Sequence, residues 1–231
     1  MNKAQDILLG LATGDALGVP VEFKPRSYFE QYPVTDMQGF GTHNQKPGTW
    51  SDDSSLAFCL AESLILGYDL KDISKRFIQW LESAYWTAHG VVFDCGITTG
   101  RAIDDLRQII ADRDYDRFKT LIDEGDEYSN GNGSLMRIAP LLFFIKGMDI
   151  SEQFEYIKSV SALTHRHIRS AIACLIHLKW MEFVLEGKDK VEAYEETQKV
   201  LHQFLINQSI STQERNHFAR LLERDITNLK R

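Results

Sequence analysis

The sequence predicts an all-α fold, and three observations support this class. Apolar residues recur at three- and four-residue steps over residues 72–86 and 168–187, which is the spacing of a helix with one buried face. Ser51 and Ser211 open further segments of this kind, where a helix-capping residue is expected. No segment alternates apolar and polar residues between hairpin turns, as a half-buried strand does.

The first expected helix lies within residues 1–18, and three glycines mark one of its faces. Gly10, Gly14 and Gly18 are spaced by four, so they share that face. Glycine inside a helix costs about 1 kcal/mol relative to alanine. Three glycines together therefore suggest a neighbouring helix that approaches closely, and we expect this helix at the centre of a compact bundle.

Two further helices are expected in the N-terminal half of the chain. Residues 56–66 are almost continuously apolar and follow Ser51, which is a good N-cap. Residues 72–86 carry one apolar stripe, and Gly90 is a plausible end for that helix.

The C-terminal half is expected to contain two more amphipathic helices. Residues 168–187 form the first, with Gly187 at its end. The second opens with Ser211 and Glu214 in capping-box spacing. Its apolar positions are Phe218, Leu221, Leu222 and Leu229.

Three less regular stretches, residues 19–29, 39–54 and 124–140, are expected to be loops. Loops held by a rigid scaffold often carry functional residues. None of the three is long enough, or rich enough in Pro and Gly, to separate two domains. Residues 1–231 are therefore interpreted as a single domain.

The composition argues against several classes of protein. The chain has 231 residues, 43% of them hydrophobic, and a formal net charge of -7 from interspersed acidic and basic residues. No basic face for nucleic acid is therefore expected, and no apolar run reaches the length of a membrane span. The three cysteines fit no metal or redox spacing, so a reduced, cytoplasmic protein is the simplest interpretation.

Ser51, Asp52 and Asp53 have two interpretations that remain open. Serine before two aspartates commonly starts a helix, because the hydroxyl caps the first turn and the helix dipole favours negative charge there. The same residues also offer three hard oxygen ligands, which suit Mg²⁺, Mn²⁺ or Ca²⁺ better than zinc. Taken alone, the pattern favours capping.

The glycine-rich stretch of residues 129–134 and the pair His165 and His167 are equally open. Two glycines allow a tight turn that aims backbone N–H groups at an anion, and Arg137 would add a positive charge. A plain loop between two helices would look the same. His165 is a ligand, a stacking partner for a base or ribose, or a solvated loop residue.

The order of these segments says more than any one of them. In chain order they are residues 14–18 (GDALG), Glu22, residues 48–54 (GTWSDDS), residues 94–100 (DCGITTG), residues 130–137 (NGNGSLMR), Pro140 and Thr164-His165. This series resembles the ADP-ribosylglycohydrolases, a family that includes the dinitrogenase reductase-activating glycohydrolases and the J1-crystallin-like proteins. The resemblance runs along nearly the whole chain.

The resemblance implies a compact orthogonal helical bundle with a cleft that holds two divalent ions, Mg²⁺ or Mn²⁺. Ser51, Asp52 and Asp53 are similar to the family's Thr-Asp-Asp-Thr motif, and would supply the first half of the metal ligands. Asp52 and Glu22 would be the catalytic carboxylates, with Glu22 on a mobile loop that gates the site or assists catalysis.

The substrate-binding residues that the resemblance implies lie in three segments. The loop of residues 130–137 would hold a diphosphate, the stretch after Asp94 would surround the ribose and phosphates, and a histidine would lie in the cleft. The individual residues are Gly96, Thr99, Gly100, Asn130, Gly131, Asn132, Gly133, Ser134, Met136, Arg137 and His165.

The implied reaction is hydrolysis of the glycosidic bond at C1 of the distal ribose, which removes ADP-ribose from a modified protein or a small molecule. The metal ions would hold the ribose hydroxyls and a water, while Asp52 or Glu22 orients or deprotonates the nucleophile. The transition state would have oxocarbenium character, which anionic groups stabilise.

One family motif is missing from this sequence. Family members end with a glycine-rich Asp-x-Asp-Thr or Asp-x-Asp-Ser motif that supplies the other metal ligands, and none occurs here. Glu223, Asp225 and Thr227 have a different spacing and are interpreted as the polar face of a helix. The chain is therefore expected to be the N-terminal, larger part of the domain, C-terminally incomplete.

Three expectations follow from the missing motif. By itself the polypeptide should bind metal weakly and show little hydrolase activity. An apolar surface should be exposed, which a homodimer or a complementing chain would cover. Two other functions also stay open: a non-catalytic module that binds ADP-ribose or a related nucleotide, and a crystallin-like structural protein with a vestigial cleft.

Overall fold

The computed structural model describes residues 2–223, and over that range it contains helices and loops but no strand. The α-helices are α1 (Lys3–Gly18), α2 (Arg26–Gln31), α3 (Asp52–Leu66), α4 (Leu70–Ser83), α5 (Ile97–Asp112), α6 (Leu142–Ile145), α7 (Ile150–Ala162), α8 (Ile168–Leu185), α9 (Lys190–Asn207), α10 (Thr212–His217) and α11 (Ala219–Leu222). Short 3-10 turns are η1 (Val19–Val21), η2 (Tyr115–Lys119), η3 (Leu121–Glu124), η4 (Glu127–Ser129) and η5 (Ala139–Leu141). The all-α prediction is confirmed.

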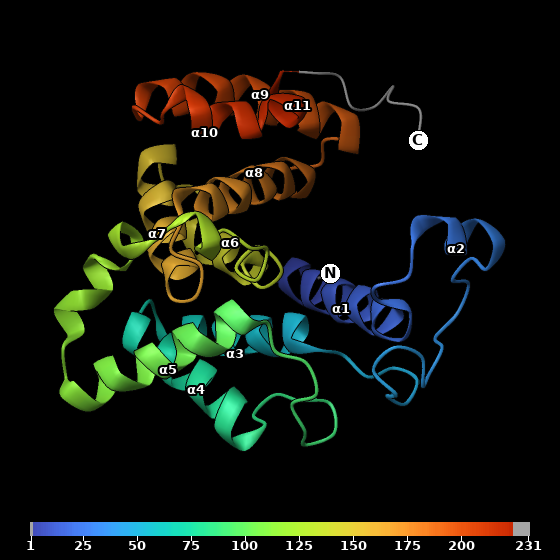
Figure 1. The fold of residues 1–231 in the computed structure, drawn as a ribbon. Coiled ribbons are helices and arrows are strands. Elements are labelled where there is room, and N and C mark those ends of the chain that lie inside the picture. The colour runs from blue at the N-terminus through green and yellow to red at the C-terminus, as the bar shows by residue number, and fades with distance from the viewer. Residues whose placement is uncertain (1, 224–231) are drawn as a thin grey trace.

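The helices pack in two groups around one core (Figure 1). Helices α3, α4 and α5 pack in sequence at one end, and α7, α8 and α9 pack in sequence at the other, with α11 against α9. Buried side chains from α3 through α11 form one cluster, in which Leu56, Phe77 and Leu175 have no exposed surface. Of the helices described here, none has both the length and the apolar character that a bilayer crossing needs.

Several predicted helix boundaries are confirmed. Ser51 Oγ accepts a hydrogen bond from the backbone N–H of Asp53, 3.3 Å away, at the start of α3. Ser211 Oγ accepts from the N–H of Glu214 at the start of α10, over 3.2 Å. Gly187 follows α8 with a φ of 100°, a conformation that glycine adopts without strain.

One predicted helix ends earlier than expected, and another is interrupted. Helix α4 ends at Ser83 rather than near Gly90. Tyr85 lies beyond this end, and its hydroxyl donates a hydrogen bond to Glu62 of α3 over 2.8 Å. The last predicted helix is interrupted at Phe218, which separates α10 from α11.

The remaining corrections concern a predicted loop and the chain's C-terminal residues. Residues 19–29 are not wholly a loop, because η1 and the start of α2 lie within them, and η4 likewise lies within the predicted loop of residues 124–140. Glu223 is exposed, whereas the predictions for Asp225, Thr227 and Leu229 lie outside the described residues.

The expectation for α1 is wrong. A methyl group built at Gly10, Gly14 or Gly18 would find no heavy atom within 4 Å, so nothing in the described part of the chain approaches this face closely. Helix α1 instead packs on α3 and η5, and Ala16 is its only buried residue among those described. The three glycines therefore lie on an open face at the edge of the bundle.

Gly10→Ala should stabilise this chain by about 0.5–1 kcal/mol, because alanine has the higher helix propensity and nothing here opposes its methyl group. Urea unfolding followed by circular dichroism measures the difference. Gly48→Ala is the control and should destabilise, since Gly48 has a φ of 79°. A lower unfolding midpoint for Gly10→Ala would contradict the open face.

Exposed apolar side chains lie on α1 and at the end of α3. Leu9 is 59% exposed, Ile65 is 82% exposed and Leu66 is 77% exposed. That a second copy or another chain covers these residues stays a prediction.

Candidate functional site

The start of α3 is held by Asp15, a residue of α1. The Asp15 carboxylate accepts hydrogen bonds from the backbone N–H of Ser51 (2.9 Å) and of Ser54 (3.1 Å). It also accepts from the hydroxyls of Ser51 (2.8 Å) and Ser54 (2.6 Å). The capping interpretation of Ser51 is thus confirmed, and Asp15 is a second cap supplied from another helix.

The carboxylates of Asp52 and Asp53 lie close enough for their negative charges to repel. Burial raises the pKa of Asp52 to about 7, and repulsion from Asp53, Asp94 and Asp15 adds to that effect. Burial also raises the pKa of Asp53 to about 6, with repulsion from Asp15 next in importance. A bound divalent cation would relieve both penalties, so the charges fit a metal site as well as a helix start.

Glu22, His43 and Asp94 form a second group of potential ligands near the first. Nε2 of His43 lies 2.6 Å from Oε2 of Glu22, and ligand atoms of the three residues lie within 4.8 Å of one another. The Thr42 hydroxyl donates to the Glu22 carbonyl over 2.7 Å, which fixes the loop against this turn. We define the acidic cluster as Asp15, Glu22, Asp52, Asp53 and Asp94.

A cavity of about 400 Å³ opens beside the acidic cluster. Asp15, Glu22, Ser51 and Asp53 line it, together with the exposed Lys24. Hydroxyl and carboxylate oxygens with one imidazole form a donor set that suits Mg²⁺ or Mn²⁺. The residues present therefore fit the cation that the sequence analysis expected.

The glycine-rich loop meets His165 and Thr99 at Gly133. Gly133 is buried, and a Cβ atom added to it would lie 2.5 Å from Cε1 of His165 and 3.1 Å from Oγ1 of Thr99. The Cβ position of Gly131 lies 3.2 Å from Nε2 of His165. Asn132 beside them is exposed, and Asn130 is partly exposed. The structure thus brings together three segments that the sequence analysis assigned to one binding site.

The next residues of the same segment turn toward the core, so Ser134 and Arg137 are buried, whereas ligand contact by the partly exposed Met136 stays a prediction. The Met136 N–H donates to the Asn132 carbonyl over 3.1 Å, which turns the chain inward. Ser134 and Arg137 have no exposed surface, and Met136 packs against the core. The buried side chains of Ser134 and Arg137 support the loop from beneath.

Residues 94–100 connect the acidic cluster to the glycine-rich loop. Asp94 at one end is close enough to Asp52 to raise its pKa. Gly96 is the N-cap of α5, and Thr99 is buried beside Gly133. Cβ positions at Gly96 and Gly100 meet only ordinary contacts, at 3.6 Å.

The first turn of α5 is suited to an anion. This helix has 16 residues, no side-chain cap and no acidic residue in its first turn. Its first backbone N–H groups therefore remain available to an anion, which the helix dipole also favours.

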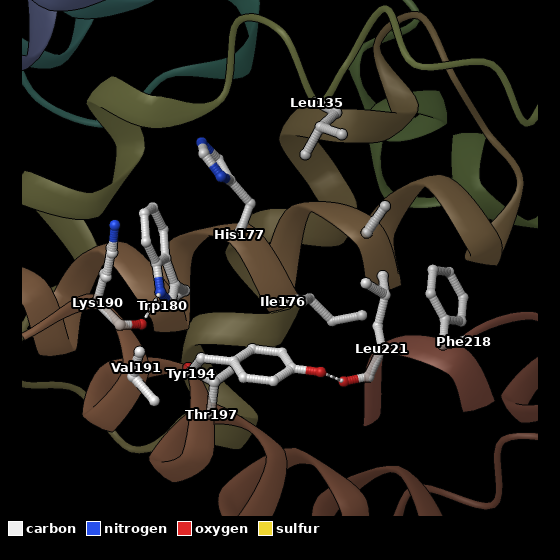
Figure 2. A pocket seen from close by; sticks show the side chains of 11 residues that line it. Leu135, Ile176, His177, Trp180, Lys190, Val191, Tyr194, Thr197, Phe218 and Leu221 are labelled. Carbon is white, nitrogen blue, oxygen red and sulfur yellow. Dashed lines mark hydrogen bonds between the residues drawn. The ribbon is translucent and has the colours of Figure 1, made fainter. Parts of the chain in front are cut away.

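A different cavity, of about 700 Å³, lies between α8, α9 and α11 (Figure 2). Its lining is mostly apolar, with Ile176, Trp180 and Leu221 among the side chains around it. Neither the acidic cluster nor any predicted site residue lines this cavity. Its lining includes no carboxylate, and Lys190 is its one charged side chain, so the candidate active site is the acidic cluster with the glycine-rich loop.

Sequence reasoning assigned no role to Asp15, His43 or Asp94. Asp15 and Asp94 stand inside GDALG and DCGITTG, two of the quoted motifs, and His43 stands in a predicted loop. Membership of those motifs was the sequence signal that pointed to Asp15 and Asp94 as site residues. Their individual roles depend on contacts such as Asp15 to Ser51, which spans 36 residues of sequence.

Asp52→Asn should stabilise the metal-free chain at about pH 8 by on the order of 1–3 kcal/mol, while changing little below about pH 4. The raised pKa means that the folded chain retains a proton that the unfolded chain releases, so wild-type stability falls as pH rises from about 4 to 7. Urea unfolding in a chelator across this range measures the difference. Asp6→Asn, at an exposed position, is the control. If the difference in unfolding free energy between Asp52→Asn and wild type were the same at every pH, the raised pKa of Asp52 would be contradicted.

Comparison with known proteins agrees with the motif series. The ADP-ribosylglycohydrolase family matches residues 1–229. The chain is 29% identical to the ADP-ribosylarginine hydrolase Tri1 of Serratia proteamaculans over 84% of this chain and 50% of that protein. It is 30% identical to the ADP-ribosyl-[dinitrogen reductase] glycohydrolase of Rhodospirillum rubrum, over 87% of this chain and 64% of that protein.

A solved structure shows the same fold. The chain superposes on an ADP-ribosylglycohydrolase-related protein complex with a TM-score of 0.69 and 30% sequence identity, over 96% of this chain and 66% of that one. The chain thus spans about half to two thirds of the length of the proteins it matches. From its sequence match, its fold and its motif series together, the chain belongs to the ADP-ribosylglycohydrolase family.

Proposed function

We propose that this protein removes ADP-ribose from a modified protein by hydrolysing the glycosidic bond at the distal ribose, with the help of a divalent cation. The observation that supports this most is the path of residues 94–100. They run from a cluster of hard oxygen ligands at Asp94 to a phosphate-type loop at Gly133. An ADP-ribosyl group has a diphosphate and ribose hydroxyls, the two features that these ends would bind.

The acidic cluster would hold the cation and supply the base. Ser51, Asp52 and Asp53 would be its ligands, and the cation would polarise ribose hydroxyls and lower the pKa of a water. Asp52, at the start of α3, would orient or deprotonate that water. Glu22, which His43 holds at 2.6 Å, would be the second carboxylate at the glycosidic bond.

The loop and the start of α5 would hold the rest of the ligand. Backbone N–H groups at Gly131–Gly133 and at Gly96–Thr99 would bind the diphosphate, with His165 beside it. Arginine is the proposed acceptor, since the matched Tri1 proteins are named ADP-ribosylarginine hydrolases.

The test is release of ADP-ribose from peptides that carry ADP-ribosyl-arginine, or ADP-ribosyl-serine for comparison, with and without Mg²⁺ or Mn²⁺. We expect metal-dependent release from the arginine peptide and its loss in Asp52→Asn, with Asp6→Asn as the active control. Release that persists in a chelator would contradict the metal-dependent mechanism. Calorimetric titration should show weak cation binding, and two tight sites would contradict the expectation drawn from the missing motif.

The second candidate is a non-catalytic module that binds ADP-ribose. Such a module would need the loop at Gly131–Gly133 and His165, but not a complete set of metal ligands. Saturable binding of ADP-ribose without any release would support this module over the hydrolase. Failure to bind ADP-ribose at all would contradict both and leave a structural, crystallin-like role.

A further inference from the structure

Arg137 is a buried cation with few partners. It has no exposed surface, and its guanidinium carbon lies 4.7 Å from the centre of the Phe77 ring. Nη2 donates to the Val160 carbonyl (3.2 Å) and to Oγ1 of Thr164 (2.7 Å), while Nε and Nη1 have no hydrogen-bond partner. Burying a charge so incompletely paired is costly. The side chain that receives its shortest hydrogen bond is Thr164, which precedes His165 in the chain.

The hydrogen bond from Arg137 determines the donor and acceptor roles of the Thr164 hydroxyl. A guanidinium only donates, so Oγ1 of Thr164 is the acceptor of that bond. Oγ1 also lies 2.9 Å from Nδ1 of His165, and no other side-chain hydrogen bond of Thr164 occurs in the described residues. Because Thr164 is buried, its hydroxyl hydrogen is satisfied only if it is donated to Nδ1. Nδ1 is then an acceptor, and the ring proton is on Nε2.

The opposite ring nitrogen faces the glycine-rich loop. Nε2 of His165 lies 3.2 Å from the Cβ position of Gly131 and 3.1 Å from that of Gly133, and within residues 2–223 no hydrogen bond satisfies it. His165 is 3% exposed, so Nε2 lies against the glycine-rich loop and has little contact with water. Burial lowers the pKa of His165 to about 4, and the charge of Arg137 acts in the same direction. The ring is therefore neutral at pH 7.

We propose that Arg137 is a positioning residue that acts through Thr164 to fix His165 as the neutral Nε2–H tautomer, whose N–H donates to a phosphate or ribose oxygen of a nucleoside diphosphate bound at Gly131–Gly133. The tautomer follows from the buried contacts, whereas the donor role rests on the function proposed above. An Nδ1–H tautomer would instead present a lone pair to the loop, and would repel such an oxygen.

The tautomer is measured directly by long-range ¹H–¹⁵N correlation spectra of the histidine side chains, which separate bare from protonated ring nitrogens. His165→Gln identifies the signals. We expect wild type and Thr164→Ser to show a bare Nδ1 and a protonated Nε2, and Thr164→Val, which lacks the hydroxyl, to lose this fixed pattern. A wild-type spectrum with the proton on Nδ1 would overturn the proposal without any variant having to fold.

The donor role is measured by calorimetric titration with ADP-ribose. Thr164→Val should weaken binding about tenfold, the value of one hydrogen bond to a charged group, and Thr164→Ser should restore it. A change in spectrum with unchanged affinity would overturn the donor role alone. Absence of ADP-ribose binding by wild type would contradict the proposed function, and the spectrum would still decide the tautomer.

Discussion

Asp15→Ala should lower the free energy of unfolding by about 3–5 kcal/mol, a large part of the stability of a domain this size. The substitution removes the acceptor of four hydrogen bonds from Ser51 and Ser54. Ser54 has no exposed surface, so its donors would stay unsatisfied away from water. Urea unfolding followed by circular dichroism measures the loss.

The control for Asp15→Ala is Asp6→Ala in the same helix. Asp6 is exposed and lies in the first turn of α1, so its replacement should change the free energy of unfolding by less than about 1 kcal/mol. Equal losses in the two variants would mean that α1 tolerates no change, and would contradict a specific role for Asp15. Asp15→Asn should be intermediate, because its amide oxygen still accepts hydrogen bonds.

Gly133→Ala should weaken ADP-ribose binding by more than about tenfold, provided that the glycine-rich loop is the ligand site. The new methyl carbon would lie 2.5 Å from Cε1 of His165, and real Cβ atoms essentially never approach so closely. The ring cannot easily yield, because Nδ1 bonds to Thr164 and the His165 carbonyl accepts from Ser161. The loop must therefore move away from His165. Calorimetric titration with ADP-ribose measures the effect.

Gly131→Ala is the matched variant for Gly133→Ala. Its Cβ would lie 3.2 Å from Nε2 of His165, a contact that a shift of a few tenths of an ångström relieves, so the loss of affinity should be smaller. Thermal melting of both variants separates loop displacement from unfolding. Unchanged affinity in a folded Gly133→Ala protein would place the ligand elsewhere.

The sequence was most informative where the signal is local. Ser51 stands before an apolar run, and its hydroxyl bonds only two residues ahead, so the pattern alone indicates the cap. The left-handed turn at Gly187 is local in the same sense. These features depend on neighbours within one helical turn, where residue type largely decides conformation.

The sequence was less informative where partners are distant or where one residue type has two uses. In the sequence, Gly10 and Gly133 both suggest a close approach of another group to the backbone. In the structure, Gly10 faces open space, whereas Gly133 lies against the ring of His165. Arg137 looks like an anion ligand from its neighbours, but the turn after Asn132 directs it into the core. Only the packed chain distinguishes these outcomes.

The acidic cluster is assembled from separate stretches of the chain, and none of them is sufficient by itself. Asp15 comes from α1, Glu22 from the turn after it, Asp52 and Asp53 from α3, and Asp94 from the loop before α5. The buried apolar cluster, by contrast, starts at Leu56 and does not include α1. A proteolytic cut between α1 and α3 would therefore remove no member of the buried apolar cluster, but it would separate Asp15 from the chain whose helix it caps. The acidic cluster thus depends on a segment that adds no side chain to that apolar cluster.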